Sequence, residues 1–208
     1  MSVRRCEELV VASLDSSPLV PLLLASLAKA GCPTTLARHV VCEPLPRGLL
    51  GGYDRELNQV VLCSEKCTDL GLVETILSHE LVHMYDQCTA RVDWQDVGHL
   101  ACSEVRAANL VHCLGPLSGA LRDGAPPFSS HAACVEAKAV RSVKAVAGLG
   151  EQAARAAVRE VFTRCYNDLE PVGRRCKGWG EQELARREAQ WLAGREEASR
   201  CYRTFKPP

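Results

Sequence analysis

The chain has 208 residues, enough for one domain with a substantial hydrophobic core and few for two. Hydrophobic residues make up 47% of the sequence but aromatic residues only 5%, so the core must be built mainly from Leu, Val and Ala, which favours packed helices. The 25 basic and 25 acidic residues cancel, and this balance argues against direct nucleic-acid binding and against bulk attraction to an anionic membrane surface.

The first 31 residues predict one helix and no secretory signal. The opening MSVRRCEELVVASLD becomes acidic before any apolar stretch reaches signal-peptide length. Residues 16–31 then contain a Ser-Ser-Pro helix start, a leucine-rich face and a glycine stop. The best apolar run, 19–28, is about half of the roughly 20 residues that cross a bilayer, so we expect a soluble protein.

A short β-hairpin is predicted next. After a Cys- and Pro-containing stretch at 32–46, GGYD at 51–54 leads through a turn at 55–58 into QVVLC at 59–63. A free edge of this hairpin would hold an extended peptide by backbone hydrogen bonds, whereas a covered hairpin would only support the following helix. The sequence leaves both alternatives open.

Residues 71–87 have the periodicity of a helix. Leu72, Ile76, His79 and His83 are separated by four, three and four residues, so they lie on one face.

Four further helices follow, with loops rich in Gly, Pro and acidic residues between them. They are predicted at 99–113, 131–147, 151–166 and 181–200. The sequence therefore predicts an α+β, mostly helical fold with one small sheet ahead of the helix at 71–87. We expect residues 1–175 to form the main domain and 176–208 a charged C-terminal helical extension.

The 12 cysteines are the unusual part of the composition. No Cys-x-x-Cys occurs, which makes a zinc ribbon or a thioredoxin-type site a poor fit. An even number spread along the chain indicates structural disulfides made in an oxidising compartment, such as the mitochondrial intermembrane space, although buried reduced cysteines are an alternative. They are Cys6, Cys32, Cys42, Cys63, Cys67, Cys88, Cys102, Cys113, Cys134, Cys165, Cys176 and Cys201.

The helix at 71–87 carries the motif His-Glu-x-x-His at residues 79–83. Two histidines one turn apart can bind one zinc ion, which lowers the pKa of a bound water from about 15.7 toward about 7. Glu80, beside the open coordination position, is the candidate acid/base that takes a proton from this water and returns it to the leaving amine. Leu81 and Val82 are expected to pack on the sides of the helix away from the metal.

A catalytic zinc has three protein ligands, so a third must follow His79 and His83 along the chain. Glu104 is the candidate, because it lies 21 residues after His83 on the next predicted helix.

Other polar residues near the motif leave alternatives for this ligand and its surroundings. Asp86 and Asp93 are candidates for an outer partner of the ligands or for the ligand itself. His99 could bind the metal or donate a hydrogen bond to a developing oxyanion. Arg106 is expected to orient a carboxylate.

Four segments, in this order, carry a resemblance to a known family: GGYDRELNQVVLC, SHELVHMYDQC, VDWQDVGHLACSEVRAANL and CYNDLEPVGR. With their surroundings they cover roughly residues 6–174. They resemble the mitochondrial inner-membrane metalloprotease family that processes and assembles ATP synthase subunit 6, also described as Ku70-binding protein 3-like. HLACSEVRAANL together with NDLEPVG is far more specific than the zinc motif alone.

This resemblance implies a compact zincin-like metallopeptidase of the intermembrane space, in peripheral contact with the mitochondrial inner membrane. It implies a polypeptide substrate, the precursor of ATP synthase subunit 6, and help in assembling the membrane sector. Matched by position, His79 and His83 are metal ligands, Glu80 is the catalytic acid/base and Glu104 stands where a third ligand is expected. The family's cysteines form disulfides during import.

The chain departs from the family at three places. Glu43-Pro44-Leu45 stands where relatives have a second cysteine near Cys42, three cysteines (Cys67, Cys176 and Cys201) have no counterpart, and residues 181–208 match no part of the family. The disulfide pairing therefore stays open.

Two functions compete with the peptidase. One is a non-proteolytic chaperone for the assembly of hydrophobic ATP synthase subunits, and the other is a disulfide-stabilised binding module with a structural zinc. The complete motif favours chemistry, and a metal with an open water position rather than four protein ligands would distinguish the peptidase from the binding module.

Overall fold

A computed structural model describes residues 2–113 and 130–175. The predicted loop at 115–130, apart from its last residue, and the predicted helix at 181–200 lie outside these residues. The division between a domain at 1–175 and an extension at 176–208 therefore stays a prediction.

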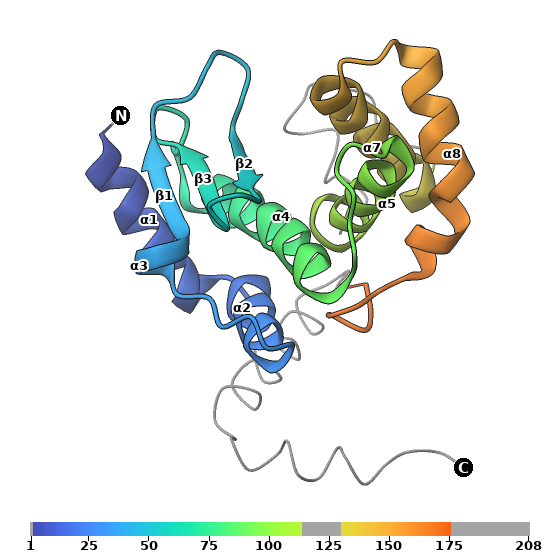
Figure 1. The fold of residues 1–208 in the computed structure, drawn as a ribbon. Coiled ribbons are helices and arrows are strands. Elements are labelled where there is room, and N and C mark those ends of the chain that lie inside the picture. Colours follow the sequence, from blue (N-terminus) through green and yellow to red (C-terminus); the bar gives the residue numbers. More distant parts are fainter. Residues whose placement is uncertain (1, 114–129, 176–208) are drawn as a thin grey trace, which may run out of the picture.

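The architecture is α+β and mostly helical, as predicted, with a three-stranded sheet ahead of the long helix α4. Figure 1 shows two halves, one made of α1 to α4 with the sheet and the other of α5, α7 and α8. The elements are α1 (Val3–Ser16), α2 (Leu19–Lys29), α3 (Leu36–His39), β1 (Val40–Glu43), β2 (Gly51–Asp54), β3 (Gln59–Cys63), α4 (Leu70–Thr89), α5 (Val97–Ala107), the π-helix η1 (Ala108–His112), α7 (His131–Ala147) and α8 (Glu151–Asn167).

Helix α1 was not predicted, whereas α2 lies within the predicted range. The Ser2 side chain caps α1 by accepting a hydrogen bond from the Arg5 N–H, and Leu9 and Val10 are among the few apolar side chains that it buries. In α2 the leucines pack against α4. The two helices cover the first hydrophobic core, which also includes residues of the sheet.

The predicted hairpin is confirmed, and a strand that was not predicted joins it. β3 is central, with β2 antiparallel on one side and β1 parallel on the other. β2 is thus an edge strand among the described residues, and it approaches α4 very closely. A Cβ at Gly51 would lie 2.7 Å from Ile76 Cγ2 of α4, so only glycine allows this approach.

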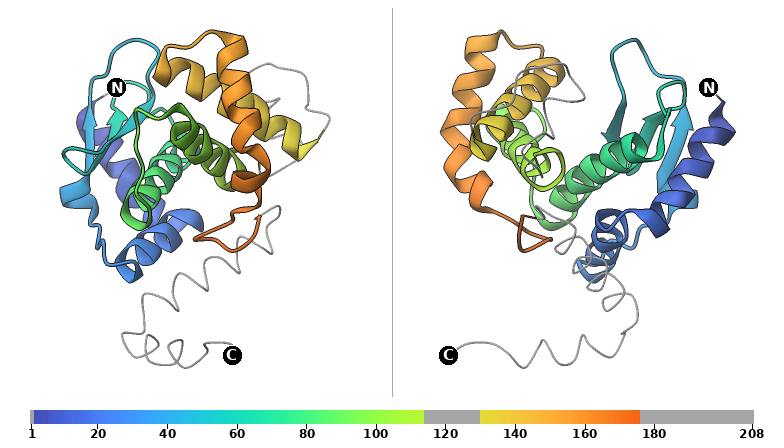
Figure 2. Two further views of the ribbon diagram at one scale, coloured as in Figure 1. Left: turned by 45° about the vertical axis from the view of Figure 1, so that its right-hand side comes forward. Right: turned by 180° about the vertical axis from the view of Figure 1, so that it is seen from behind.

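Helix α4 places the motif between the two halves. Asp69 caps its start by accepting a hydrogen bond from the Leu72 N–H, which explains why the helix begins at Leu70. Leu81 and Val82 are fully buried, as expected for the sides away from the metal. Figure 2 shows from two further sides that α4 of the first half lies beside α5 of the second.

The second half has its own core, formed by α5, α7 and α8. Helix α5 begins at Val97, two residues before the predicted start, because the Asp96 side chain caps it through the His99 N–H. Its continuation is a π-helix and not the regular helix predicted up to 113. Helices α7 and α8 follow the predicted ranges closely.

The expected disulfides are present. Eight of the ten cysteines in the described residues are paired, and the buried Cys63 and Cys67 are free. The pairs are Cys6–Cys42, Cys32–Cys88, Cys102–Cys165 and Cys113–Cys134. Two of them lie within the first half and two within the second, so each half is crosslinked by its own disulfides.

None of the described helices is by itself long and apolar enough to cross a membrane. Helices α1 and α2 together have the required length and composition, with a bend of 84° between them.

Replacing both Cys102 and Cys165 by Ala should lower the free energy of unfolding by about 4 kcal/mol. This disulfide closes a loop of 63 residues, and the estimate is the chain entropy that the unfolded state regains without it. Chemical denaturation monitored by circular dichroism measures the change. Cys63→Ala, which removes a free buried thiol, is the control, and an equal loss in the two proteins would contradict a crosslink effect.

Candidate metal centre

Three side chains from α4 and α5 converge in the interior between the two halves. His79 and His83, one turn apart on α4, have their Nε2 atoms 3.0 Å from each other. Glu104 of α5 lies opposite, with Oε2 3.5 Å from His79 Nε2 and Oε1 3.6 Å from His83 Nε2. One ligand atom from each residue lies within 4.8 Å of the others, so the three side chains could hold one metal ion.

The burial and hydrogen bonding of the Glu104 carboxylate also fit a bound cation. Its carboxylate is almost completely buried, with 4% of the residue exposed. The side chains of His79 and Ser142 lie beside it, but no described residue donates to Oε2 with good hydrogen-bond geometry. A buried carboxylate oxygen without a donor is costly unless a cation compensates it. Two nitrogens and a carboxylate are also the donor set of many catalytic zinc sites.

The outer nitrogen of His83 is held by a relay through Ser103. The Ser103 hydroxyl donates to Asp86 Oδ2 at 2.6 Å, so its oxygen must accept the hydrogen bond that joins it to His83 Nδ1 at 2.7 Å. His83 therefore carries its proton on Nδ1 and directs the Nε2 lone pair toward Glu104 and His79. Arg106 donates to Asp86 Oδ1 at 3.0 Å, which agrees with the expectation that it orients a carboxylate.

The outer nitrogen of His79 meets a third histidine. His112 Nε2 lies 2.9 Å from His79 Nδ1, at the end of the π-helix η1. Burial holds the pKa of His112 well below its ordinary value, so its ring stays neutral and can accept a hydrogen bond from Nδ1–H of His79. That arrangement again leaves Nε2 of the inner histidine free to bind a metal.

Glu80 lies next to the edge of the sheet. Its carboxylate accepts a hydrogen bond from the backbone N–H of Tyr53 in β2, and it is buried. Burial raises the pKa of Glu80 to about 7, although His79 acts in the opposite direction. A carboxyl with this pKa can both take and return a proton near neutral pH.

The pKa values of the converging groups are shifted in opposite directions when no ion is bound. Burial alone would lower the pKa of His79, but Glu104 and Glu80 outweigh it and raise the pKa to about 9. Burial lowers the pKa of His83 to about 4. Burial tends to raise the pKa of Glu104, yet His83 and His79 lower it to about 2. At neutral pH one proton therefore remains on the group, at His79.

The other candidates from the sequence lie apart from this group. His99 is exposed, and its Nδ1 accepts a hydrogen bond from the Asp93 N–H at 3.1 Å. The Asp93 carboxylate in turn accepts from the Gln95 N–H and caps a turn. Asp86 touches the site only through Ser103.

Sequence reasoning missed three contributors to the site: Ser103, His112 and the Tyr53 N–H. A usable signal existed for two of them. Ser103 directly precedes Glu104 in the sequence, and His112 follows Glu104 by eight residues, a spacing that places His112 near the Glu104 side of a helix. The Tyr53 N–H is a backbone group, so no side-chain pattern could reveal it.

An α+β chain with a buried His-Glu-x-x-His helix and a facing glutamate has the site of a metallopeptidase. The chain belongs to the Peptidase M76 family, whose sequence profile matches residues 4–173.

Its relatives agree with this assignment. The chain is 36% identical to the "Mitochondrial inner membrane protease ATP23 homolog" of Xenopus laevis over 89% of this chain and 80% of that protein. It is 37% identical to the human protein of the same name, over 83% of this chain and 71% of the human protein. It is 35% identical to the "Mitochondrial inner membrane protease ATP23" of Mycosarcoma maydis, over 76% of this chain and 77% of that protein. No solved structure matches the chain. The chain is thus a protease of the mitochondrial inner-membrane type.

Replacing Glu104 by Gln should weaken the binding of a divalent metal such as zinc by more than the roughly 10–100-fold that loss of an outer-shell partner costs, because a charged candidate ligand is removed. The fold should persist, since Gln has the same shape. Zinc content after dialysis and competition with a chelator measure the effect, and Glu160→Gln on the exposed side of α8 is the control. Equal zinc affinity in the two variants would contradict the ligand set.

Zinc affinity should depend on pH because of His79. With its pKa raised to about 9, His79 is protonated at neutral pH without the ion, so binding must displace that proton. Affinity should rise by up to about tenfold per pH unit between about pH 6.5 and 8.5, with about one proton released per ion. Calorimetry in buffers of different ionisation enthalpy measures the release. A flat affinity above about pH 6.5 would show that His79 titrates as an ordinary imidazole.

Proposed function

We propose that the chain is a zinc-dependent endopeptidase with a zincin-type active site, in which His79, His83 and Glu104 bind the metal and Glu80 is the catalytic acid/base. The observation that carries this proposal is that the four side chains are placed for two different roles. Three of them point donor atoms at one place, while Glu80 contacts the edge strand instead. In this proposal residues 1–175 form the catalytic domain.

The donor set supports zinc as the metal. Three protein ligands leave a fourth tetrahedral position for water or substrate, which distinguishes a catalytic site from a structural one. A bound zinc ion would supply a Lewis acid that polarises the scissile carbonyl and acidifies a water molecule.

The chain's own residues then have defined tasks. Ser103 and His112 hold the two ligand imidazoles so that both Nε2 lone pairs face the metal position. Glu80 accepts a proton from the attacking water and donates it to the leaving amine, a role that its pKa of about 7 favours. Burial of the site excludes bulk water and strengthens each of these interactions.

The edge strand β2 supports a polypeptide substrate. Gly51 and Tyr53 alternate with residues that bond to β3, so their backbone groups face the edge beside Glu80, where the Tyr53 N–H donates to the Glu80 carboxylate. An extended peptide can add to such an edge by backbone hydrogen bonds, whatever its side chains. Trp94 borders the same space. Its ring centroid lies 5.7 Å from that of His83 and 6.5 Å from that of Tyr53.

The proposed place of action is the mitochondrial intermembrane space, at the inner membrane and in peripheral contact with it. Four disulfides fit an oxidising compartment, and the relatives are mitochondrial inner membrane proteases by name. The family resemblance supports the precursor of ATP synthase subunit 6 as the substrate and a part in assembling the membrane sector of ATP synthase.

Replacing Glu80 by Gln should leave zinc binding intact and reduce cleavage of a subunit 6 precursor by about 10²–10⁴-fold, because Gln cannot move the proton. Cleavage is followed by mass spectrometry with purified zinc-loaded protein. Glu74→Gln is the matched control, since Glu74 lies on the same helix but binds Ser16 of α1.

Two outcomes would count against the proposal. Normal cleavage by the Glu80→Gln protein would exclude Glu80 as the acid/base. Cleavage that survives removal of zinc by a chelator would exclude metal catalysis altogether.

A further inference from the structure

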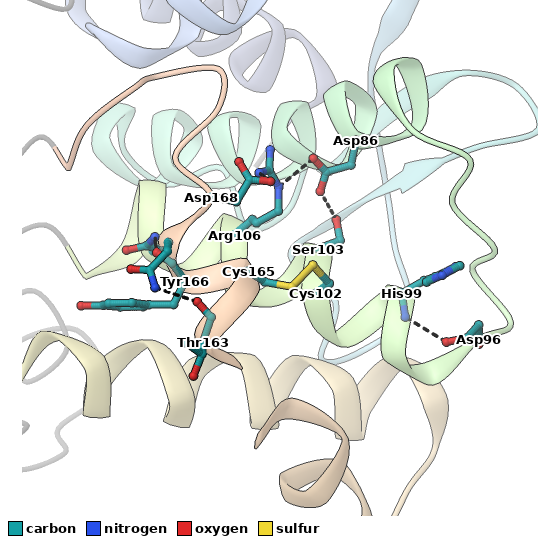
Figure 3. Close-up of a disulfide and its surroundings, with 12 residues drawn as sticks. Asp86, Asp96, His99, Cys102, Ser103, Arg106, Thr163, Cys165, Tyr166 and Asp168 are labelled. Atoms are coloured by element: carbon teal, nitrogen blue, oxygen red, sulfur yellow. Dashed lines mark hydrogen bonds and ion pairs between the residues drawn. A yellow bond between two sulfur atoms is a disulfide. The ribbon is translucent and has the colours of Figure 1, made fainter. Parts of the chain in front are cut away.

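The segment after α8 contains no candidate metal ligand, yet it binds a residue of α5. Arg106 donates from Nη2 to the backbone carbonyl of Glu170 at 2.7 Å, and its Nη1 forms an ion pair with the carboxylate of Asp168. The Arg106 side chain is buried, with 5% of the residue exposed. Figure 3 shows Arg106 between Asp168 on one side and Asp86 on the other.

The guanidinium of Arg106 is held from three directions. Its Nε donates to Asp86 Oδ1 while Nη1 and Nη2 contact residues 168 and 170, so the planar group cannot rotate. A lysine could not make these three contacts at once. Asp86 is buried as well, so the Asp86–Arg106 pair must keep its geometry to offset its desolvation.

The same contacts continue to a metal ligand. Asp86 accepts from the Ser103 hydroxyl at 2.6 Å, and Ser103 accepts from His83 Nδ1 at 2.7 Å. We call the connected side chains of Asp168, Arg106, Asp86 and Ser103 the His83 relay. Each link joins a donor to an acceptor, so the contacts run without a break from Asp168 to His83.

A disulfide fixes the two ends of the His83 relay relative to each other. Cys102 directly precedes Ser103 on α5, and Cys165 lies three residues before Asp168 on α8. Figure 3 shows this crosslink beside the relay. The position of residues 168–170 relative to Ser103 is therefore set by a covalent bond as well as by packing.

We propose that Asp168, acting through the His83 relay, is a positioning residue for the metal centre. By holding Arg106 it keeps Asp86 and Ser103 in place, and these fix the ring orientation and the Nδ1–H tautomer of His83. The inference rests on the proposed function in so far as His83 binds the metal. It gives the NDLEPVG segment a task at a site that none of its residues touches.

The first experiment measures the zinc affinity of Asp168→Asn by competition with a chelator. The Asp168 side chain is 46% exposed, and Asn retains the oxygen that accepts from the Glu170 N–H, so the variant should fold. Because the relay also lines a cavity of about 520 Å³, water can replace the lost contact. Affinity should fall by about 10-fold, within the range for outer-shell partners of a metal ligand.

A matched control lies two residues away. Glu170 contacts Arg106 through its backbone carbonyl, so Glu170→Gln removes a neighbouring negative charge but leaves the relay intact. Its zinc affinity should equal that of the unchanged protein. An equal loss in Glu170→Gln and Asp168→Asn would show a general charge effect and would overturn the proposal, as would unchanged affinity in Asp168→Asn.

The second experiment asks whether Asp168 acts through Ser103. Ser103→Ala removes the last link before His83, so adding Asp168→Asn to it should cause no further loss of zinc affinity. Additive losses would mean that Asp168 acts by another route and would overturn the proposal. If the unchanged protein itself binds no zinc, the proposed function fails, and that result is separate from either outcome for the relay.

Discussion

The carboxylate of Glu104 lies between the imidazoles of His79 and His83 with almost none of its surface in contact with water. Burying a carboxylate costs several kcal/mol unless opposite charge and hydrogen bonds compensate it. Here His79, which carries a proton when no ion is bound, compensates part of this cost, so α4 and α5 must stay at their observed separation. This contact raises the pKa of His79 and lowers that of Glu104, whereas burial lowers the pKa of His83. A bound cation would satisfy the Glu104 carboxylate more completely.

The candidate metal centre lies where the two hydrophobic cores meet. Each histidine is therefore contacted by residues of both halves. α4 belongs mainly to the first core and α5 to the second, while Ser103 and His112 of the second half reach back to the outer nitrogens of the two histidines. Disulfides within each half limit how far either core can shift. The geometry of the metal centre therefore depends on the packing between the halves. The His83 relay from Asp168 is one set of contacts that maintains this geometry.

Much of the local structure could be predicted from the sequence, and the misses have physical reasons. The helix with the motif, the hairpin, α7 and α8 have strong periodicity or clear turn residues. α1 was missed because its buried stripe is narrow and lies among charged residues, and β1 because a four-residue strand whose partner is 20 positions away has no local signature. The π-helix that carries His112 differs from an α-helix only in its hydrogen-bond register, which composition does not encode.

The sequence by itself determined the part of the site that one helix can carry. The spacing of His79, Glu80 and His83 sets their relative directions through the helical repeat, whatever surrounds them. It also nominated Glu104, but it could not place that residue opposite the histidines. Only the tertiary structure decided that approach, along with the disulfide partners, the Tyr53 N–H beside Glu80 and the relay through Ser103. These contacts join residues far apart in the chain, and loops allow many placements of such residues until packing selects one.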